Sequence, residues 1–451
     1  MSGPPLRPLP AEPRSLLVEG GRPLAGSVAI QGSKKSLPKI LMATALTDDP
    51  CLVENVSWVD DLEVAAGVLR GMGRKADRIG PRRIEVKGAC GSGGSIRSTL
   101  TGVSDRSRVP VLAAGPQLVR FGEAWVPPLG GDLIGPRPVD AHISMLRSLG
   151  AQVERRDGWL RATALALQGA PLKLKFPMVG VTEHALLTGV LVPGRTEIHN
   201  AAVDPEIEEL AAVLKAMGAK IEIEARARRI SIDGVAVLEG FRHTVGQDRM
   251  EAGSWASLAL ATGGEITVEG LGVYGMEPFL RVYRAAGGRA VEGSEGICFS
   301  RSGKSEATLR IESGPWPLYE SDWHPPMVTA LTQTAAISAV HETLFADRFT
   351  TVASLREMGA EIELHSSCGI GSSPCRLARQ GDAHRAVIKG PSRLRAGRLQ
   401  LRDLRGGFGL LAAALVATGE SVLSGGEVLE RGYESLPERI RRLGGAVHGL
   451  D

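Results

Sequence analysis

The sequence predicts an α/β protein built from six copies of one supersecondary unit. A helical segment that ends at a glycine and runs into a short β-type stretch recurs along the 451 residues, as in "MLRSLGAQVERR" and "VLKAMGAKIEIE". The marker glycines lie 68 to 85 residues apart, and they are Gly73, Gly150, Gly218, Gly287, Gly359 and Gly444. The alternative is a doubly wound α/β protein with accidental local similarity, which a near-constant period over six copies disfavours.

A second recurring element lies upstream of the marker glycines. It is a helix of small apolar residues followed by a β-type stretch, as in "SWASLALATGGEITVEGL". Helices with so little charge are buried on most sides, whereas amphipathic ones such as "EIEELAAVLKAMG" face outward. Each unit should therefore run helix, strand, helix, glycine, strand, and the glycine should end its helix as a left-handed cap. In places the sheets should lie outside a helical core.

Composition excludes several classes of function. Hydrophobic residues make up 43% and charged residues 23%, and the net charge is +3, so neither a nucleic-acid nor a membrane partner is indicated. The five cysteines form no CxxC pair, and we expect free thiols without a disulfide, metal or cofactor site. Residues 1–14 are Pro-rich and should form a flexible tail rather than a signal peptide. No apolar stretch is long enough to span a bilayer, so the expected location is the cytoplasm. The oligomeric state is not indicated.

The stretch "GGDLIGPRPVD", residues 130–140, is a loop constrained by glycine and proline. Asp132 stands in it between a Gly pair and an apolar pair. An Asp that forms the turn is one interpretation. A functional carboxyl group is the other.

Several stretches, taken in order, resemble the enolpyruvyl transferases, in particular the members that act on UDP-N-acetylglucosamine. They include "GSKKSLPKILMATAL", "LGGDLIGPRPVDAHISMLRSLGA", "GQDRMEAGSW", "RDLRGG" and "ERGYESLPERIRRLGG". The resemblance runs from about residue 15 to the end, and the shikimate-pathway members are a more distant match. It implies a two-domain inside-out α/β barrel with three repeats in each domain, which face each other across a cleft. The expected domains are 15–33 with 248–451, and 34–247, which carries an active-site loop at 127–142.

The resemblance implies transfer of the enolpyruvyl group of phosphoenolpyruvate to a hydroxyl group, with release of phosphate. An acid protonates the methylene carbon, the hydroxyl attacks, and phosphate leaves the tetrahedral intermediate as the methyl group loses a proton. Phosphoenolpyruvate carries a phosphate and a carboxylate, and the planar arginine fork suits such oxyanions. The matching cations are Lys34, Arg108, Arg137, Arg348, Arg405 and Arg431. Arg106 is the alternative to Arg108, and any single Arg could instead form a surface ion pair. Lys34 is predicted to open a helix, whose amides also favour an anion.

The position of Asp132 is a Cys in most members of this family, and that Cys acts on the methylene carbon and in product release. A carboxyl group can do the same acid work if it is protonated at the right moment. A free Asp has a pKa of about 3.9, so Asp132 needs burial or anionic neighbours to hold a proton near neutrality. Fosfomycin alkylates the loop Cys of the usual members, so Asp132 predicts fosfomycin resistance.

The attacking hydroxyl needs a base, and Asp322 in "PLYESDWHPP" matches the family's Asp near that hydroxyl. A helix N-cap is its alternative role. Asp403 matches a second catalytic Asp, and Asp248 an interdomain segment with a hinge or structural role. The residues implied to act in catalysis are Asp132, Asp322, Lys34, Asp403 and Arg431.

The acceptor implied by the resemblance is a uridine nucleotide. The residues that match its binding positions are Lys35, Arg137, Pro138, Val139, Asp140, His142, Val179, Gly180 and Asp322. Lys35 stands where the family usually has Asn, and Met178 where it has Ser. Three functions therefore remain open: transfer to UDP-N-acetylglucosamine in peptidoglycan precursor synthesis, transfer to another uridine nucleotide such as UMP in nucleoside-antibiotic biosynthesis, and nucleotide binding by a non-catalytic paralogue.

Overall fold

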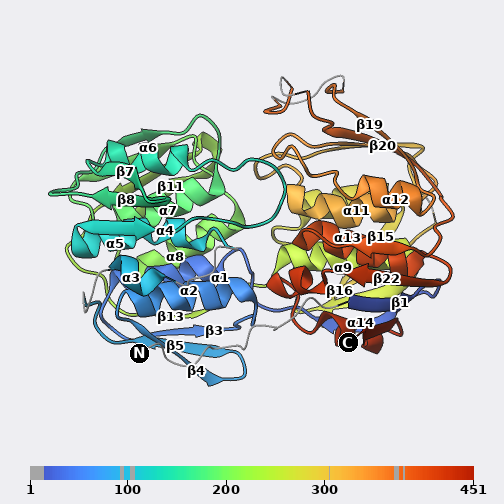
Figure 1. The fold of residues 1–451 in the computed structure, drawn as a ribbon, viewed down its shortest axis with the longest axis horizontal. Coiled ribbons are helices and arrows are strands. Elements are labelled where there is room, and N and C mark those ends of the chain that lie inside the picture. The colour runs from blue at the N-terminus through green and yellow to red at the C-terminus, as the bar shows by residue number, and fades with distance from the viewer. Residues whose placement is uncertain are drawn as a thin grey trace. The chain divides into compact units, whose positions relative to one another are not determined.

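The computed structural model describes residues 15–91, 96–101, 107–303, 305–369, 375–378 and 381–450. The predicted tail, residues 1–14, lies outside this part of the chain. The described residues form two compact units (Figure 1). The first unit holds residues 31–131 and 137–246, and the second holds residues 15–30, 132–136 and 247–450. The short loop segment 132–136 therefore groups with the second unit, although its neighbours on both sides group with the first.

The first unit contains three repeats. The first repeat comprises β13 (Arg242–Thr244), α1 (Leu37–Ala43), η1 (Thr44–Leu46), β3 (Cys51–Glu54), α2 (Asp60–Gly71), β4 (Lys75–Gly80) and β5 (Arg83–Lys87). The second comprises α3 (Ile96–Leu100), α4 (Val109–Leu112), α5 (Ala114–Phe121), β6 (Glu123–Val126), α6 (Asp140–Ser148), β7 (Gln152–Arg156) and β8 (Trp159–Thr163). The third comprises β9 (Pro171–Lys173), α7 (Val179–Gly189), β10 (Arg195–His199), α8 (Pro205–Ala216), β11 (Lys220–Glu224), η2 (Ala225–Ala227) and β12 (Arg229–Asp233).

The second unit contains the other three repeats. The fourth repeat comprises β2 (Ala25–Ala29), α9 (Arg249–Thr262), β14 (Glu265–Glu269), α10 (Glu277–Ala285), β15 (Gly288–Gly293) and β16 (Gly296–Arg301). The fifth comprises β17 (Thr308–Glu312), η3 (Ser321–Trp323), α11 (His324–Leu331), β18 (Ile337–His341), α12 (Val352–Glu357), β19 (Glu361–His365) and β20 (Arg385–Lys389). The sixth comprises β21 (Arg398–Gln400), α13 (Leu404–Val416), β22 (Glu420–Ser424), η4 (Gly426–Arg431), α14 (Leu436–Arg442), β23 (Ala446–Leu450) and β1 (Ser15–Glu19).

Each repeat contributes one sheet with the same pairing pattern. In the third repeat β9 runs parallel to β10, β10 pairs antiparallel with β12, and β12 pairs antiparallel with β11. Four other sheets have this order, and the sheet β6-β8-β7 has its antiparallel pairs without a parallel first strand among the described residues. The repeat therefore runs strand, helix, strand, helix, strand, strand, so it has one strand more at each end than the sequence pattern predicts.

Three sheets contain strands from distant parts of the chain. β13 completes the sheet of the first repeat by pairing with β3, and β2 pairs with β14 across the whole first unit in sequence. β1 lies between β22 and β23, the last strands of the chain. The N-terminal strands thus belong to the unit formed by the C-terminal half.

The marker glycines end their helices as predicted. All six have positive φ angles, between +88° and +107°. The Gly218 amide donates to the Lys215 carbonyl at 2.9 Å, and the next amide, of Ala219, donates to the Leu214 carbonyl at 3.0 Å. This hydrogen-bond pair is the Schellman motif, which needs a left-handed residue that glycine adopts without strain.

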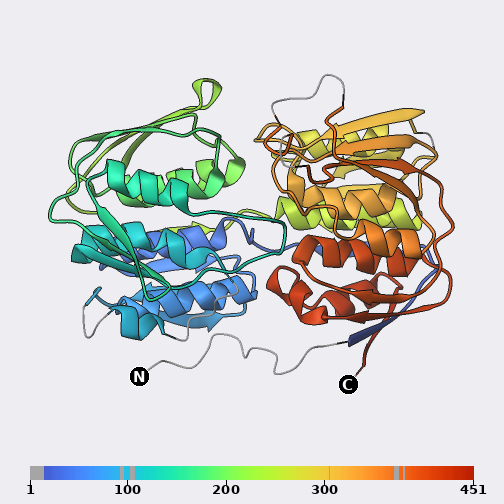
Figure 2. The ribbon, with the colours of Figure 1, turned by 45° about the horizontal axis from the view of Figure 1, so that its top comes forward.

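The core of each unit is helical and the sheets cover it, as Figures 1 and 2 show. The apolar helices α9, α11 and α13 contact one another and are almost fully buried. The strands alternate buried and exposed residues, for example in β10 and β14, so one face packs on helices and the other faces outward. The predicted α/β class with sheets outside a helical core is confirmed. None of the helices in the described ranges is long and apolar enough to cross a membrane.

Candidate active site

Six of the predicted site residues lie in one cluster of the second unit. Its members are Asp132 from the loop segment 132–136, Asp322 from η3, Arg348 from the turn before α12, Asp403 and Arg405 from the start of α13, and Arg431 from the end of η4. Three acids are thus brought beside three guanidinium groups, although the sequence separates them by up to 299 positions.

Arg348 is the centre of this cluster. Its Nη2 pairs with Oδ1 of Asp322, and its Nη1 lies 4.0 Å from Oδ1 of Asp403. Its Nε donates to the carbonyl oxygen and to the hydroxyl of Ser321, both at 3.1 Å. Burial lowers the pKa of Arg348, but the carboxylates of Asp322 and Asp403 outweigh burial and raise it. Arg348 therefore stays cationic and fixes two acids next to each other.

Asp403 caps α13 and is the most buried of the three acids. Its Oδ1 accepts a hydrogen bond of 2.8 Å from the Gly406 amide. Burial raises the pKa of Asp403, Arg348 opposes this shift, and the negative charges of Asp132 and Asp322 add to it. The net shift is upward, so Asp403 holds a proton more readily than an ordinary Asp does.

Asp132 contacts the cluster through its side chain. Its Oδ1 lies 2.5 Å from Nη1 of Arg431 and accepts a longer bond of 3.4 Å from the Leu404 amide. The turn itself is closed by the backbone, since the Ile134 amide donates to the Asp132 carbonyl at 3.0 Å. Turn formation does not account for these two side-chain contacts, because Leu404 and Arg431 are distant in sequence.

Arg405 is held from one side by aromatic and hydroxyl groups. Its Nη1 donates to the Tyr433 hydroxyl at 2.9 Å, its guanidinium carbon lies 5.2 Å from the Tyr433 ring centroid, and Tyr433 also contacts the Ser254 hydroxyl at 2.7 Å. Burial lowers the pKa of Arg405, but Tyr433 and Asp322 raise it above its usual range. Its Nε lies 3.8 Å from Oδ2 of Asp322 and has no hydrogen-bond partner within the described residues. Arg405 thus retains donor capacity for an anion.

Glu342, a buried carboxylate that contacts residues of the cluster's support, was not predicted from the sequence. Glu342 accepts hydrogen bonds from the Ser321 hydroxyl at 2.7 Å and the Leu344 amide at 2.8 Å, and it lies 2.9 Å from Nδ1 of His324. Burial raises its pKa, but His324 and the other donors outweigh burial and lower it to about 2. The ionised Glu342 therefore anchors η3 and with it Asp322. Nothing in the sequence after "ISAVH" distinguishes this Glu from a surface residue.

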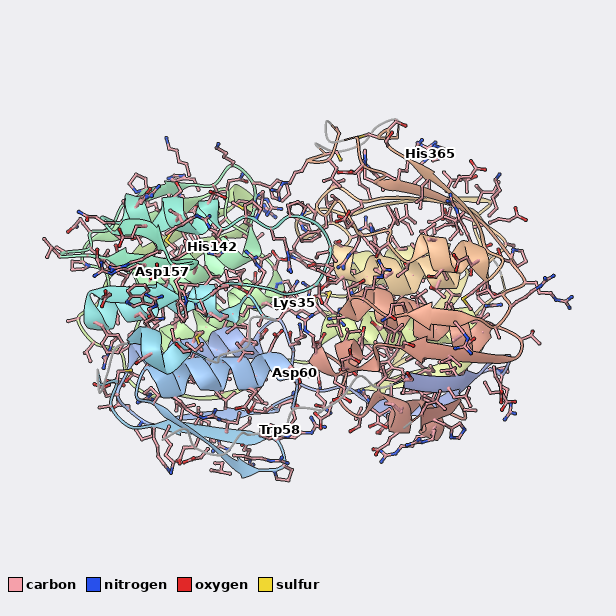
Figure 3. All side chains as sticks on the ribbon, in the orientation of Figure 1. Lys35, Trp58, Asp60, His142, Asp157 and His365 are labelled. Atoms are coloured by element: carbon pink, nitrogen blue, oxygen red, sulfur yellow. The ribbon has the colours of Figure 1, made fainter. Side chains whose placement is uncertain are left out.

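The two predicted lysines lie in the turn before α1, and Figure 3 labels Lys35. The prediction that Lys34 opens the helix is wrong, because residues 34–36 form a turn and α1 begins only at Leu37. Nζ of Lys34 lies 2.8 Å from Oδ2 of Asp61, and Nζ of Lys35 lies 3.8 Å from Oε2 of Glu206. Both cations are therefore fixed by acids of the first unit.

Arg108 and Arg137 pack on the same glycine. A Cβ at Gly131, whose φ is +111°, would lie 2.4 Å from Nη2 of Arg137 and 3.3 Å from Cγ of Arg108. Burial and the charge of Arg137 lower the pKa of Arg108 to about 10. No carboxylate of the described chain pairs with Arg108, and two adjacent cations of this kind favour an anion. The alternative, Arg106, lies outside the described residues.

Most of the predicted nucleotide residues lie at the starts of two helices of the first unit. Pro138 and Val139 lead into α6, which begins at Asp140, and Val179 and Gly180 are the first residues of α7. His142, labelled in Figure 3, lies in the first turn of α6 and is buried. A Cβ at Gly180 would lie 3.7 Å from Cε1 of His142, so the structure brings these two predicted residues together.

His142 is oriented by a second histidine that the sequence did not single out. Nδ1 of His142 lies 3.1 Å from Nδ1 of His184, and Nε2 of His184 accepts a hydrogen bond of 3.0 Å from the Gly115 amide. Because Nε2 of His184 is an acceptor, its Nδ1 carries the hydrogen and donates to His142, which leaves a hydrogen on Nε2 of His142. Burial, with the charge of Arg108, lowers the pKa of His142 to about 4. His142 is therefore a neutral donor.

Two aspartates have local roles that differ. Asp322 does not cap α11, because the cap position is Trp323 and the Asp322 carboxylate pairs with Arg348 instead. Asp248 does cap its helix, since its Oδ1 accepts from the Met250 and Glu251 amides at 2.9 and 2.8 Å. Asp248 thus has the structural role that was one of its two predicted roles.

Comparison with known proteins shows the family to which the chain belongs. Residues 18–440 match the family described as EPSP synthase (3-phosphoshikimate 1-carboxyvinyltransferase). The UDP-N-acetylglucosamine 1-carboxyvinyltransferase of Protochlamydia amoebophila is 37% identical over 441 residues, covering 96% of this chain and 93% of the relative. The enzyme of the same name from Acidiphilium cryptum is 34% identical over 436 residues, covering 96% and 98%.

Solved structures of low sequence identity share the fold. The enolpyruvyl transferase NikO from Streptomyces tendae superposes with a TM-score of 0.82 at 20% identity and covers 98% of this chain and 99% of its own. An EPSP synthase from Acinetobacter baumannii gives a TM-score of 0.70 at 17% identity, with coverage of 98% and 100%. The resemblance stated from the motifs is confirmed: the chain belongs to the EPSP synthase family and is an enolpyruvyl (1-carboxyvinyl) transferase.

Proposed function

We propose that this enolpyruvyl transferase acts on UDP-N-acetylglucosamine in peptidoglycan precursor synthesis, taking the enolpyruvyl group from phosphoenolpyruvate and releasing phosphate. The observation that carries this proposal is the cluster of the second unit, where Asp132, Asp322 and Asp403 lie against Arg348, Arg405 and Arg431. The names of the curated relatives support the choice of acceptor.

Asp322 is the base that we assign to the acceptor hydroxyl. Its side chain is 31% exposed, against 19% for Asp132 and 5% for Asp403, so it is the acid that a substrate reaches most easily. Arg348 holds its Oδ1 in place, and Ser321 and Glu342 fix the backbone on which it stands. A carboxylate held in this way accepts a proton at a defined position.

Asp132 is the acid that we assign to the methylene carbon. Arg431, its partner, is also one of the cations proposed to bind phosphoenolpyruvate. An arriving oxyanion competes for Arg431, which releases the Asp132 carboxyl group for proton transfer to the carbon. The negative charge of Asp132 helps to raise the pKa of Asp403, so Asp403 can hold a proton beside Asp132. The Asp132 carboxylate takes a proton back from the methyl group when phosphate leaves.

The anionic substrate is held by several guanidinium groups. In the second unit Arg405 keeps an unpaired Nε that is buried, and such a donor binds an oxyanion strongly once water is excluded. We also assign phosphoenolpyruvate contacts to Lys34, Arg108 and Arg137 of the first unit. Arg108 has no acidic partner in the described part of the chain, which suits it to this role.

The nucleotide is assigned to the first unit and Asp322. The residues that we propose for it are Lys35, Arg137, Pro138, Val139, Asp140, His142, Val179, Gly180 and Asp322. The first amides of α7 favour an anion because a helix N-terminus carries unpaired N–H groups and a positive dipole end. The Nε2–H of His142, which lies beside Gly180, adds a neutral donor for a diphosphate oxygen.

Phosphate release from phosphoenolpyruvate tests the proposal. The protein is assayed with UDP-N-acetylglucosamine, with UMP, and without nucleotide, and the product is identified by mass spectrometry. We expect release with UDP-N-acetylglucosamine and a product that has gained one enolpyruvyl group. Release with UMP alone would assign the second acceptor, and nucleotide binding without any release would identify a non-catalytic paralogue. Either result contradicts the proposal.

A further inference from the structure

Four potential metal ligands converge at one end of the sheet β17-β18-β20-β19 in the second unit. They are His341 at the end of β18, Cys368 after β19, Cys375, and His384 directly before β20. Their ligating atoms all lie within 4.8 Å of one another. A tetrahedral zinc site with two sulfurs at about 2.3 Å and two nitrogens at about 2.0 Å has ligand–ligand distances of about 3.3–3.8 Å. The observed group needs to contract by only about 1 Å to reach that geometry.

Both imidazoles are already oriented for a metal. Nδ1 of His341 lies 2.9 Å from Oε2 of Glu312, and Nδ1 of His384 lies 2.7 Å from the carbonyl oxygen of Asp382. Histidines that bind metals typically donate their other ring N–H to a carboxylate or a carbonyl in this way. In each ring the hydrogen therefore lies on Nδ1, and Nε2 keeps its lone pair.

The Nε2 atoms face the thiols. Nε2 of His384 lies 3.4 Å from Sγ of Cys368. Nε2 of His341 is buried in a side chain that is 5% exposed, and it has no hydrogen-bond partner among the described residues. A buried acceptor without a partner costs free energy, and a bound cation removes that cost. This atom is evidence for a ligand that is independent of the clustering.

We propose that His341, Cys368, Cys375 and His384 bind a structural Zn²⁺. Two thiolates with two imidazoles in a tetrahedral group are the donors that zinc prefers. Four protein ligands leave no position for a substrate, so the ion stabilises the fold and takes no part in the reaction. The cysteine spacing alone predicts no such site, because the two cysteines form no CxxC pair and the histidines come from strands that meet only in the folded sheet.

The ion would brace the strand that supports the acid–arginine cluster. His341 is followed by Glu342, which holds Ser321 through its carboxylate. The Arg376 amide, next to Cys375, donates to the Thr343 carbonyl at 3.3 Å. Zinc bound here would tie the excursion between β19 and β20 to the end of β18. The inference does not depend on which nucleotide is the acceptor.

Metal analysis of the full chain tests the inference. The protein is purified without chelator, and zinc is measured by mass spectrometry, with about one ion expected per chain. Substitution with Co²⁺ should give the intense thiolate-to-cobalt charge-transfer band and the visible bands of a tetrahedral site. Cys368→Ser and Cys375→Ser should each lose the charge-transfer intensity and most of the zinc, whereas the matched change Cys298→Ser, on β16, should keep both.

If the Cys variants misfold, their loss of zinc is not informative. A further variant therefore keeps all four ligands. Glu312→Gln weakens the partner of His341, and zinc affinity measured by chelator competition should fall roughly 10–100-fold. The inference is overturned if the native protein retains no zinc after loading, if bound cobalt shows no thiolate band, or if Cys298→Ser loses metal as the other variants do. A Cys368–Cys375 disulfide that persists after incubation with zinc and a thiol reductant, found by mass spectrometry, would also overturn it.

Discussion

Oδ1 of Asp132 lies 2.5 Å from Nη1 of Arg431, although 299 positions separate the two residues in the chain. The loop that carries Asp132 thereby delivers a carboxyl group to the end of η4 and to the first amide of α13. We proposed that the same guanidinium receives the anionic substrate. The partner that holds the proposed acid is thus also the group that the substrate binds, so substrate binding frees the acid.

Two substitutions of Asp132 test whether turnover needs its acidic proton or only a side chain of that size at that position. Asp132→Asn keeps the size of the side chain but cannot donate a carboxylic proton, so turnover should fall by roughly a hundredfold or more. Asp132→Cys should keep measurable activity and become sensitive to fosfomycin, because a thiolate is a better nucleophile than a carboxylate. Phosphate release and a fosfomycin time course with mass spectrometry measure both effects. A covalent adduct on the native enzyme, or full activity of Asp132→Asn, would show that the acid lies elsewhere.

Asp322→Asn should abolish most turnover and weaken nucleotide binding far less, because the amide can still hydrogen-bond the acceptor but cannot act as the base. The change removes the proposed base but keeps the shape of the side chain, so kcat should fall by roughly 10²–10⁴-fold. Phosphate release gives kcat, and calorimetry with UDP-N-acetylglucosamine gives the Kd. The matched control is Asp347→Asn, which makes the same change at an exposed position beside Arg348 and should keep wild-type kcat. Near-normal kcat in Asp322→Asn would leave Asp322 only as a partner of Arg348.

Tyr433→Phe should weaken both stability and phosphoenolpyruvate binding. It removes the hydroxyl that Arg405 and Ser254 share, and a buried donor left unpaired costs about 1–3 kcal/mol. Urea unfolding measures the loss, and the KM for phosphoenolpyruvate should rise because Arg405 is no longer aligned. Tyr283→Phe is the control, since it removes a bond of 3.2 Å from Tyr283 in α10 to the Ser300 carbonyl on β16 and should change stability alone. An unchanged KM in Tyr433→Phe argues against a role of Arg405 in binding this substrate.

The His142–His184 pair should make the protein acid-sensitive. The pKa of His142 is lowered to about 4 in the folded state, whereas an unfolded His has about 6.5. Between these values the unfolded chain binds more protons, so this contribution is fully present above pH 6.5 and is lost as the pH falls. At pH 5 the loss from His142 is about 2 kcal/mol. His142→Gln should show a smaller drop in unfolding free energy between pH 7 and pH 5 than the native protein. Equal drops would contradict the assignment of a neutral buried His142, and the interval from pH 7 to pH 8 serves as the internal control.

Gly218→Ala tests the helix ends that define the repeat. Gly218 has a φ of +103° and no atom within 4 Å of the added Cβ, so only backbone strain opposes the change. The expected cost is about 1–2 kcal/mol in the free energy of unfolding. Gly397→Ala is the matched control. A Cβ at Gly397 also meets open space, but the φ of Gly397 is not positive, so this change should be neutral or slightly stabilising. Equal effects of the two changes would show that left-handed geometry does not matter at these positions.

The repeat could be predicted from the sequence because its signals are local. A helix that must end within one turn and reverse into a strand needs a left-handed residue, and the six marker glycines report that need directly. The burial of α9 and α13 could be predicted for a similar reason, since both helices are apolar beyond their first turn and so have no polar face to expose to water. Three of the extra strands, β9, β13 and β21, have only three residues each, which is too short for a clear alternating pattern.

The site was only partly predictable because much of its support is long-range. Family motifs indicated the residues of the cluster, but no pattern indicated that Glu342 would hold Ser321 or that His184 would orient His142. The Asp322 cap was a sound local alternative, and it is wrong because α11 begins at His324, which puts Trp323 at the cap position, and the Asp322 carboxylate pairs with Arg348. The zinc ligands were invisible for the same reason, because their spacing follows from the pairing of β18 with β20.

The position of β1 in the sheet of the sixth repeat has a consequence for biosynthesis. β1 leaves the ribosome long before its neighbours β22 and β23. At 5–20 residues per second the delay is roughly 20–80 s, during which the first unit can complete its own fold. Nascent chains arrested after residue 246 has left the ribosomal exit tunnel should therefore protect residues 31–91, 107–131 and 137–246 from protease while residues 15–19 remain cleavable. Until β22 and β23 are synthesised, β1 is an unpaired strand that could pair with another chain, so molecular chaperones have their longest opportunity to act on this strand.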